Sequence, residues 1–389
     1  MKKTIIVLGI LCGLTANAQN WSLTGNSGTT PGTNFLGTTD NQSLVFKTNN
    51  IEWMKLTPKG RLIFQNIDNG YGWDNNLFIA GGNDFATGLG NTGLGLGSLV
   101  SVTTGGANTA VGANALKPNT TGGGNTAVGV NSMLNNTIGN NNTSVGLNSL
   151  NGPGTLNENT AVGFAAMARY NAASTDAASY NSAFGFSALG SMINGNYNTA
   201  LGRRALRGLL NGNNNIGIGE NAASNLSNGN NNIIIGYETT TTGTGVNNQL
   251  NIGNWIRGNN GTIGIGTSNL PADGVAADGG IYKLFVKDGI KTEKVRVDVA
   301  SANGWADYVF YDDYKLRDLK SLETYINENK HLPEVPSTEE AIKNGIELKQ
   351  MNILLLKKIE ELTLYLLQQN KQLIDQNQRI EDLEKSIKK

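Results

Sequence analysis

Apolar and polar positions recur with a fixed period between residues 91 and 252. A glycine falls at positions 95, 112, 129, 146, 163, 185, 202, 219 and 236, which is a 17-residue period with one longer step, from 163 to 185. The residue before this glycine is always apolar, from Leu94 to Ile235, and the residue two before it is small in all copies but one. A period this regular predicts a solenoid with one coil per repeat.

The composition of the repeat favours strands over helices. Each unit carries two or three glycines and several asparagines, which weaken helices, and its first apolar column is rich in Val and Ile. A second apolar column, four residues after the glycine, runs from Leu99 to Leu206. We therefore expect a mainly β fold, with a parallel β-roll over residues 91–267 and coils about 4.7–4.8 Å apart. The glycine is expected to bend the chain between two short strands, and the long step to insert five residues between 165 and 180.

An asparagine precedes the glycine by four residues in all nine copies, at the end of turns such as Gly-Gly-Gly-Asn. Asparagine tolerates left-handed backbone conformations and bonds its own turn, and stacked asparagine side chains can bond one another. We expect these residues to form a ladder between coils.

The apolar columns also predict self-association. Two apolar columns per coil are too few to line every wall of a closed tube, so a thin roll leaves one apolar face in water. A face of several hundred Å² is typical of an interface. Threefold closure would cover it, and we expect a fibrous homotrimer.

The C-terminal segment, residues 347–389, has a different period. Apolar residues alternate at spacings of three and four, as in a coiled coil. This seam consists of Asn352, Leu355, Ile359, Leu362, Leu366, Gln369, Leu373, Gln376, Ile380, Leu383 and Ile387. Leu354, Leu356, Leu364 and Leu367 widen it and favour more than two strands. A dimer, or a lone amphipathic helix docked on a domain, is the alternative.

The remaining segments have their own patterns. Residues 19–90 read as short strands with turns, and we expect a β cap. Residues 250–267 are expected to end the roll as a hairpin. Residues 268–315 alternate like strands and carry aromatic side chains, so they predict a small β neck. Residues 316–346 predict a short helical connector, in which Ser337 and Glu340 form a capping box.

The N-terminal segment, residues 1–18, resembles a secretory signal peptide. Lys2 and Lys3 precede a short apolar run, and Ala16-Asn17-Ala18 offers a cleavage site, so we expect export and cleavage after Ala18. Cys12 lies in this segment and leaves the mature chain without a thiol; the alternative is a lipoprotein cysteine. The 30 basic and 30 acidic residues balance, which argues against nucleic-acid binding.

Residues suited to catalysis or to cofactor binding are scarce. His331 is the single histidine and lies in a proline-bounded loop, where we expect a structural or solvated role. The mature chain has no cysteine, and no Gly-x-Ser-x-Gly elbow accompanies the histidine. We therefore predict no catalytic, cofactor-binding or metal-ligating residues, and no enzymatic activity.

Three weaker hypotheses remain. The turns Asp68-Asn69-Gly70 and Asp74-Asn75-Asn76 could hold Ca²⁺, although turn chemistry alone explains them. Arg203, Arg204 and Arg207 make one basic patch, which is either a solubilising cluster or a site for an anionic glycan. A threonine column from Thr92 to Thr199 could order water and bind ice, but the paired Thr-x-Thr columns of such surfaces are lacking.

The run Asn-Thr-Ala-Val-Gly-x-Asn-Ala-Leu resembles the head repeats of trimeric autotransporter adhesins, the YadA-like left-handed parallel β-roll. The likeness covers residues 91–252, although the turns here are longer. It implies trimerisation and binding of extracellular matrix or cell-surface glycans. Members of that family end in a membrane-anchoring barrel segment that this chain lacks, so we expect no transmembrane anchor in the mature chain.

The block from Trp305 onward resembles a C-terminal module of bacterial tail-fibre-like surface proteins, as does the N-terminal block. Two functions follow as expectations. The first is a secreted or cell-surface fibrous adhesin or structural protein. The alternative is a tail-fibre-like trimeric component of a phage-derived particle, with the C-terminal module driving assembly. An enzyme of polysaccharide metabolism ranks third.

Overall fold

The computed structural model describes residues 24–64, 76–152, 155–168, 178–271, 273–276, 279–298 and 305–388. The chain divides into two compact units, Met1–Asn260 and Gly261–Lys389. It is mainly β: a parallel β-solenoid with 17-residue coils, and a C-terminal helix. The expected signal peptide and most of the insertion between 165 and 180 lie outside the described residues.

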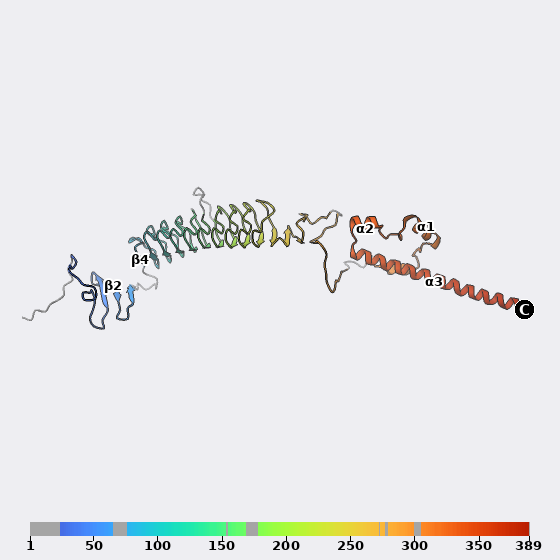
Figure 1. Ribbon diagram of the computed structural model, residues 1–389, viewed down its shortest axis with the longest axis horizontal. Helices are drawn as coiled ribbons and strands as arrows, with labels where there is room; N and C mark the ends of the chain where they lie inside the picture. The colour runs from blue at the N-terminus through green and yellow to red at the C-terminus, as the bar shows by residue number, and fades with distance from the viewer. Residues whose placement is uncertain are drawn as a thin grey trace, which may run out of the picture. The chain divides into compact units, whose positions relative to one another are not determined.

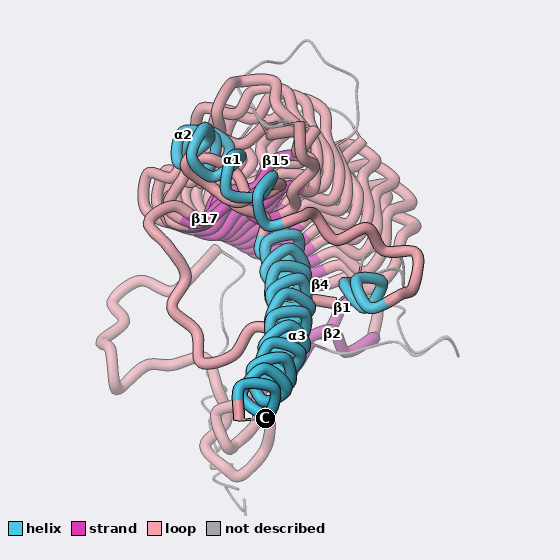
Figure 2. The backbone as a smooth tube through the Cα atoms, turned by 90° about the vertical axis from the view of Figure 1, so that its right-hand side faces the viewer, coloured by secondary structure: helices cyan, strands magenta, loops and turns pink. Residues whose placement is uncertain are grey.

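Each coil of the solenoid contributes one short strand to a single parallel sheet (Figures 1 and 2). Neighbouring strands pair in register, with Thr109 beside Thr126 and Val111 beside Val128. The strands are β4 (Leu77–Ile79), β5 (Thr92–Leu94), β6 (Thr109–Val111), β7 (Thr126–Val128), β8 (Thr143–Val145), β9 (Thr160–Val162), β10 (Ser182–Phe184), β11 (Thr199–Leu201), β12 (Ile216–Ile218), β13 (Ile233–Ile235) and β14 (Gln249–Ile252).

The core lies between the sheet and the opposite side of each coil. The middle residue of each strand from β5 to β12 points inward and is small, as at Ala110, whereas in β13 it is Ile234; both of these side chains are fully buried. The middle residue faces the second apolar column, whose members Leu116 and Met133 are also fully buried. The small column therefore lets the two sides of the coil approach closely, as the repeat predicts.

The repeated glycine ends each strand and brings adjacent coils together. At Gly112 the backbone φ is +127°, and a Cβ there would lie 2.6 Å from the carbonyl oxygen of Gly129 in the next coil. Only glycine fits such a position without strain. The expectation of a second short strand after this glycine is wrong, because turn residues follow it and Asn114 and Leu116 adopt left-handed conformations.

The parallel sheet begins one coil earlier than the repeat suggests. Strand β4 pairs with β5, and Asn76 accepts a hydrogen bond from the backbone of Asn91 at 2.8 Å. The repeat does not predict this first coil, because Asn76 and Asn91 are separated by fewer residues than the 17-residue period and no glycine follows β4 directly. At the other end, β14 forms an antiparallel hairpin with β15 (Ile256–Asn259), as expected.

A separate antiparallel sheet precedes the solenoid in sequence. It consists of β1 (Leu44–Thr48), β2 (Ile51–Leu56) and β3 (Leu62–Phe64). Asn49 and Asn50 both have positive φ and form the two-residue turn between β1 and β2. The strands expected in the N-terminal segment are thus confirmed.

The second unit begins with β16 (Thr262–Ile265) and β17 (Leu284–Val286), which pair in parallel. A 3-10 helix, η1 (Ala306–Phe310), follows, so the expectation of strands around the aromatic residues 305–314 is wrong. The helices are α1 (Leu319–Asn329), α2 (Thr338–Asn344) and α3 (Leu348–Ile387). The predicted capping box of Ser337 and Glu340 begins α2.

Candidate interaction surfaces

The inner asparagine column fixes the position of every strand. Asn142 donates to the side-chain oxygen of Asn125 at 3.0 Å and to the carbonyl of Leu156, while its own oxygen accepts the backbone N–H of Asn159 at 3.0 Å. The same pattern joins each coil to the next, and these side chains are buried. The ladder therefore satisfies the buried backbone groups that precede each strand.

The outer surface of the parallel sheet carries an apolar column along its length, beside a column made mostly of threonine. Because side chains alternate along a strand, the residues on either side of the buried small residue point outward. We call this surface the ladder face. Its apolar column consists of Leu94, Val111, Val128, Val145, Val162, Phe184, Leu201, Ile218 and Ile235. Several members are well exposed, including Leu94 at 45% and Leu201 at 49%.

The column after the glycine extends this apolar surface. It contains Leu96, Val130, Leu147, Phe164 and Phe186, all of which are exposed. Phe164 and Phe186 stack with their ring centroids 5.2 Å apart. Charge interrupts the column at Arg203 and Glu220, which pair at 2.6 Å, and the next residue in it is the exposed Tyr237. The sequence therefore predicted correctly that a thin roll leaves one apolar face uncovered within a single chain.

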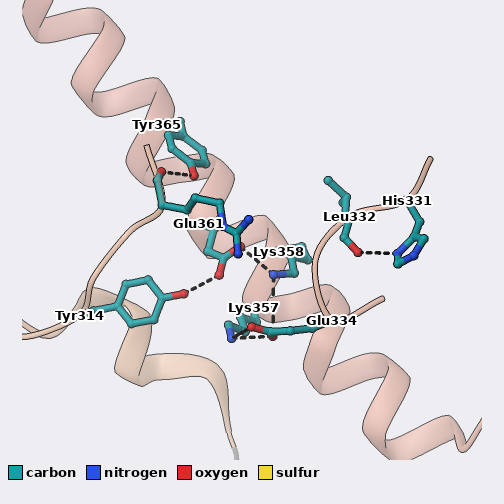
Figure 3. A network of polar contacts seen from close by, with 9 residues as sticks. Tyr314, His331, Leu332, Glu334, Lys357, Lys358, Glu361 and Tyr365 are labelled. Carbon is teal, nitrogen blue, oxygen red and sulfur yellow. Dashed lines mark hydrogen bonds and ion pairs between the residues drawn. The ribbon is translucent and has the colours of Figure 1, made fainter. Parts of the chain in front are cut away.

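Helix α3 has two different sides. The first half of one side carries a polar network with preceding residues (Figure 3). Tyr365 donates to the carbonyl of Arg317 at 2.6 Å, Tyr314 donates to the Glu361 carboxylate, and Lys357 pairs with Glu334 at 2.6 Å. This side of α3 also contacts η1.

The network shifts the pKa values of its members. Burial, and then the hydrogen bond to the Glu361 carboxylate, raises the pKa of Tyr314. Burial alone would raise the pKa of Glu334, but the hydrogen bond from Lys357 and the nearby positive charges outweigh it and lower that pKa. Burial, followed by the negative charge of Asp307, raises the pKa of Glu360. This last carboxylate is buried, and its Oε2 has no hydrogen-bond partner among the described residues.

The other side of α3 is the predicted heptad seam, and it is exposed in the single chain. Its apolar members up to residue 383 are between 46% and 61% exposed; they are Leu355, Ile359, Leu362, Leu366, Leu373, Ile380 and Leu383. Leu354, Leu356 and Leu364 are only partly exposed, unlike the seam residues. These three residues therefore do not widen an exposed seam, whereas Leu367, the fourth residue expected to do so, is 60% exposed.

The sheet of β1, β2 and β3 also carries an uncovered apolar face. The strand register places Leu44 beside Leu56, and Phe46 beside Met54, which in turn lies beside Phe64. Phe46, Leu56, Leu62 and Phe64 are all exposed. A three-stranded sheet needs such a face to be covered for independent stability.

The structure does not place the residues that the sequence suggested for catalysis, calcium binding and anion binding in one common site. His331 lies in the C-terminal unit, where its Nδ1 is 2.9 Å from the carbonyl oxygen of Leu332 (Figure 3). Its ring packs edge-on against Tyr325. The two Asp-containing turns at 68–75 lie outside the described residues, whereas Asn76 is the first rung of the inner ladder. Arg203, Arg204 and Arg207 do lie together, at one edge of the ladder face.

Within the described part of the chain, no group of three or more His, Cys, Asp or Glu side chains could hold a metal ion. None of the described helices has a stretch long and apolar enough to cross a membrane. The chain matches no protein-family model, no curated protein and no solved structure.

Proposed function

We propose that this protein is a secreted, non-catalytic fibre that works as a homotrimer and attaches cells to external surfaces. Its β-roll is left-handed, as in the adhesin heads that the repeat resembles. Sister chains cover the ladder face of the roll and the seam of α3, which assembles as a coiled coil. The observation that carries this proposal is the apolar column of the ladder face, which runs from β5 to β13 above a buried core. Its exposed members are Leu94, Val145, Phe184 and Leu201.

Three separate surfaces support self-association. The ladder face, the α3 seam and the face of the β1–β3 sheet are each apolar and each exposed in the single chain. Burying about 400 Å² of such surface contributes on the order of 10 kcal/mol before the costs of association. The same partner, a second and third copy of the chain, covers all three.

A trimeric fibre suits adhesion because it presents three identical copies of each surface site. Linked copies bind a surface with an avidity that far exceeds the affinity of one site, provided that all copies can engage at once. Binding sites of low affinity on the outer columns of the roll are therefore sufficient for attachment to a surface.

One pair of variants tests the role of the ladder face. Val145 is 38% exposed and lies in the ladder face, whereas Ile138 is 45% exposed and lies outside it. We expect Val145→Lys to shift the chain from trimer toward monomer in sedimentation velocity, because it introduces three charges into a buried interface. Ile138→Lys should leave the trimer intact. Equal behaviour of the two variants would contradict the proposed interface.

Adhesion itself is tested on cells. Antibodies against the chain should label intact cells, and cells that lack the protein should attach less well to glycan- or matrix-coated surfaces. Recovery of the protein only in particles assembled in the cytoplasm would contradict the adhesin proposal.

A further inference from the structure

Arg204 occupies a position where the fold favours asparagine. Its column, the second residue after the repeated glycine, includes Asn114, Asn131 and Asn148, which have φ between +56° and +58° and form a ladder with Nδ2–Oδ1 distances of 3.2 Å. Arg204 has φ +57°. Asparagine is among the residues that tolerate this region, whereas arginine gains no local hydrogen bond there. The arginine therefore costs stability that an asparagine would not.

The charge on Arg204 is also uncompensated. Arg203 is neutralised by Glu220 at 2.6 Å, but among the described residues neither Arg204 nor Arg207 has an ion pair. The Nε of Arg204 is shielded from water and has no hydrogen-bond partner in the described part of the chain. This donor is therefore unsatisfied within the chain, and the described residues leave the Arg204 guanidinium without an anionic partner.

Aromatic surface lies directly beside these guanidinium groups. Arg203 and Arg204 lie 5.8 Å and 5.9 Å from the ring centroid of Phe186. Phe186 stacks on Phe164, and each ring is more than 40% exposed. The cluster thus joins an apolar platform to a positive charge over a short distance.

We propose that Phe164, Phe186, Arg204 and Arg207 form a binding site for an acidic saccharide. The carboxylate or sulfate accepts hydrogen bonds from Arg204 and Arg207, because a planar guanidinium matches such groups well. The apolar C–H surface of the sugar ring packs against the exposed phenylalanine rings. A nucleic acid fits less well, since it requires many phosphate contacts and this cluster offers only two free arginines.

This site deepens the proposed adhesive function and rests on it. The ladder face consists of strand residues, whereas Phe164, Phe186 and Arg204 lie in the turns that follow the strands. We therefore expect a trimer that closes through the strand residues to present three copies of the site. Three copies give a weak site the avidity that attachment needs.

Calorimetry with residues 19–389 tests the site. The probes are an oligogalacturonate, a sulfated heparin fragment of similar length, and a neutral maltooligosaccharide. We expect at least one acidic probe to bind, with an affinity that falls as salt rises, and the neutral probe not to bind. Binding to the oligogalacturonate alone assigns the carboxylate as the recognised group, and binding to the heparin fragment alone assigns the sulfate.

Arg204→Asn is the decisive variant, because it removes the charge and restores the usual residue of the column. It should weaken acidic-saccharide binding at least about tenfold while leaving the thermal midpoint unchanged or higher. Arg257→Gln is the matched control: Arg257 is bonded to Asn254 at 3.0 Å, lies in β15, and should not affect binding.

The proposal fails if neither acidic probe binds, if Arg204→Asn stays within about twofold of the native affinity, or if polyglutamate binds as tightly as the acidic saccharides. These outcomes are distinguishable from failure of the proposed function. A trimer that does not bind the acidic probes overturns only the saccharide site, whereas a monomeric native chain overturns the fibre itself.

Discussion

The asparagine that precedes each strand explains why the coils stack in one register. The Asn142 side chain donates to the asparagine of the coil before it and to a turn carbonyl of the coil after it, and it accepts the backbone N–H of the next asparagine. A side chain that lacks either the amide donor or the carbonyl acceptor cannot make all three bonds. Gln249 takes this place in the last coil, where its backbone N–H donates to the side chain of Asn232 at 3.0 Å. The asparagine ladder, with Gln249 as its last member, therefore runs the length of the parallel sheet.

Replacing one rung should destabilise the solenoid strongly. In Asn142→Leu, the backbone N–H of Asn159 and the carbonyl of Leu156 both lose their partner. Since an unpaired buried polar group costs roughly 1–3 kcal/mol, we expect a loss of about 2–5 kcal/mol in chemical denaturation. Asn135→Leu, at an exposed site, is the control and should change stability by less than about 0.5 kcal/mol. A similar loss in both variants would show that the ladder is not the cause.

Glu360 predicts a pH dependence in the C-terminal unit. Its folded pKa is raised above the ordinary value of 4.5, so the folded state binds its proton more tightly than the unfolded state. Its contribution to stability is therefore complete below pH 4.5 and is lost as the pH rises through the folded pKa.

Glu360→Gln isolates this effect from the lowered pKa of Glu334, which acts in the opposite direction. We expect the variant to raise the thermal midpoint of the helical signal by a few degrees at pH 7, and to match the native chain near pH 4. Circular dichroism at 222 nm measures both. A variant less stable than the native chain at pH 7 would mean that the ionised carboxylate has a favourable partner.

At the scale of elements, α3 packs against other elements along one side and leaves its heptad seam exposed. Its first half binds η1 and the loop at Glu334 through one side, and the heptad seam occupies the other. The docked side agrees with the hypothesis of an amphipathic helix packed on a domain, and the exposed seam leaves the coiled coil as a proposal for the other side.

Two adjacent residues of α3 test whether the heptad seam forms the contact between chains. Leu373 is 59% exposed and belongs to the seam, while Ile374 is 58% exposed and lies beside it. We expect Leu373→Gln to lower the free energy of unfolding of the assembled stalk by roughly 2–3 kcal/mol per chain, because it removes a buried apolar side chain from the coiled coil. Ile374→Gln should have little effect. Stronger destabilisation by Ile374→Gln would place the contact on a different side.

The elements differ in how far the sequence predicts them. The repeat period predicted the parallel sheet, the buried second column and the uncovered face, because each depends on local spacing alone. The helix caps at Ser337 and Gly345 were predictable for the same reason. The first coil at Asn76 and the 3-10 helix at 306–310 were not, since an irregular step and a tertiary contact with α3 determine them.

The edge cluster was only partly predictable. The sequence showed three nearby arginines, but not that Glu220 neutralises one of them or that the rings of Phe164 and Phe186 stack beside the others. Both contacts join residues at equivalent places in successive coils. They therefore appear only once the coils are stacked.

At the scale of the whole molecule, the same requirement recurs in each part of the chain: exposed apolar surface has to be covered. The N-terminal sheet, the solenoid and the C-terminal helix each carry exposed apolar side chains in the single chain. Patches of this kind are uncommon on monomeric proteins, and self-association removes all of them with a single type of contact.

Sedimentation equilibrium of residues 19–389 at micromolar concentration tests this requirement most directly. The proposed fibre predicts a single species with three times the mass of the chain, stable to dilution over at least a decade of concentration. A well-folded species with the mass of one chain would contradict it.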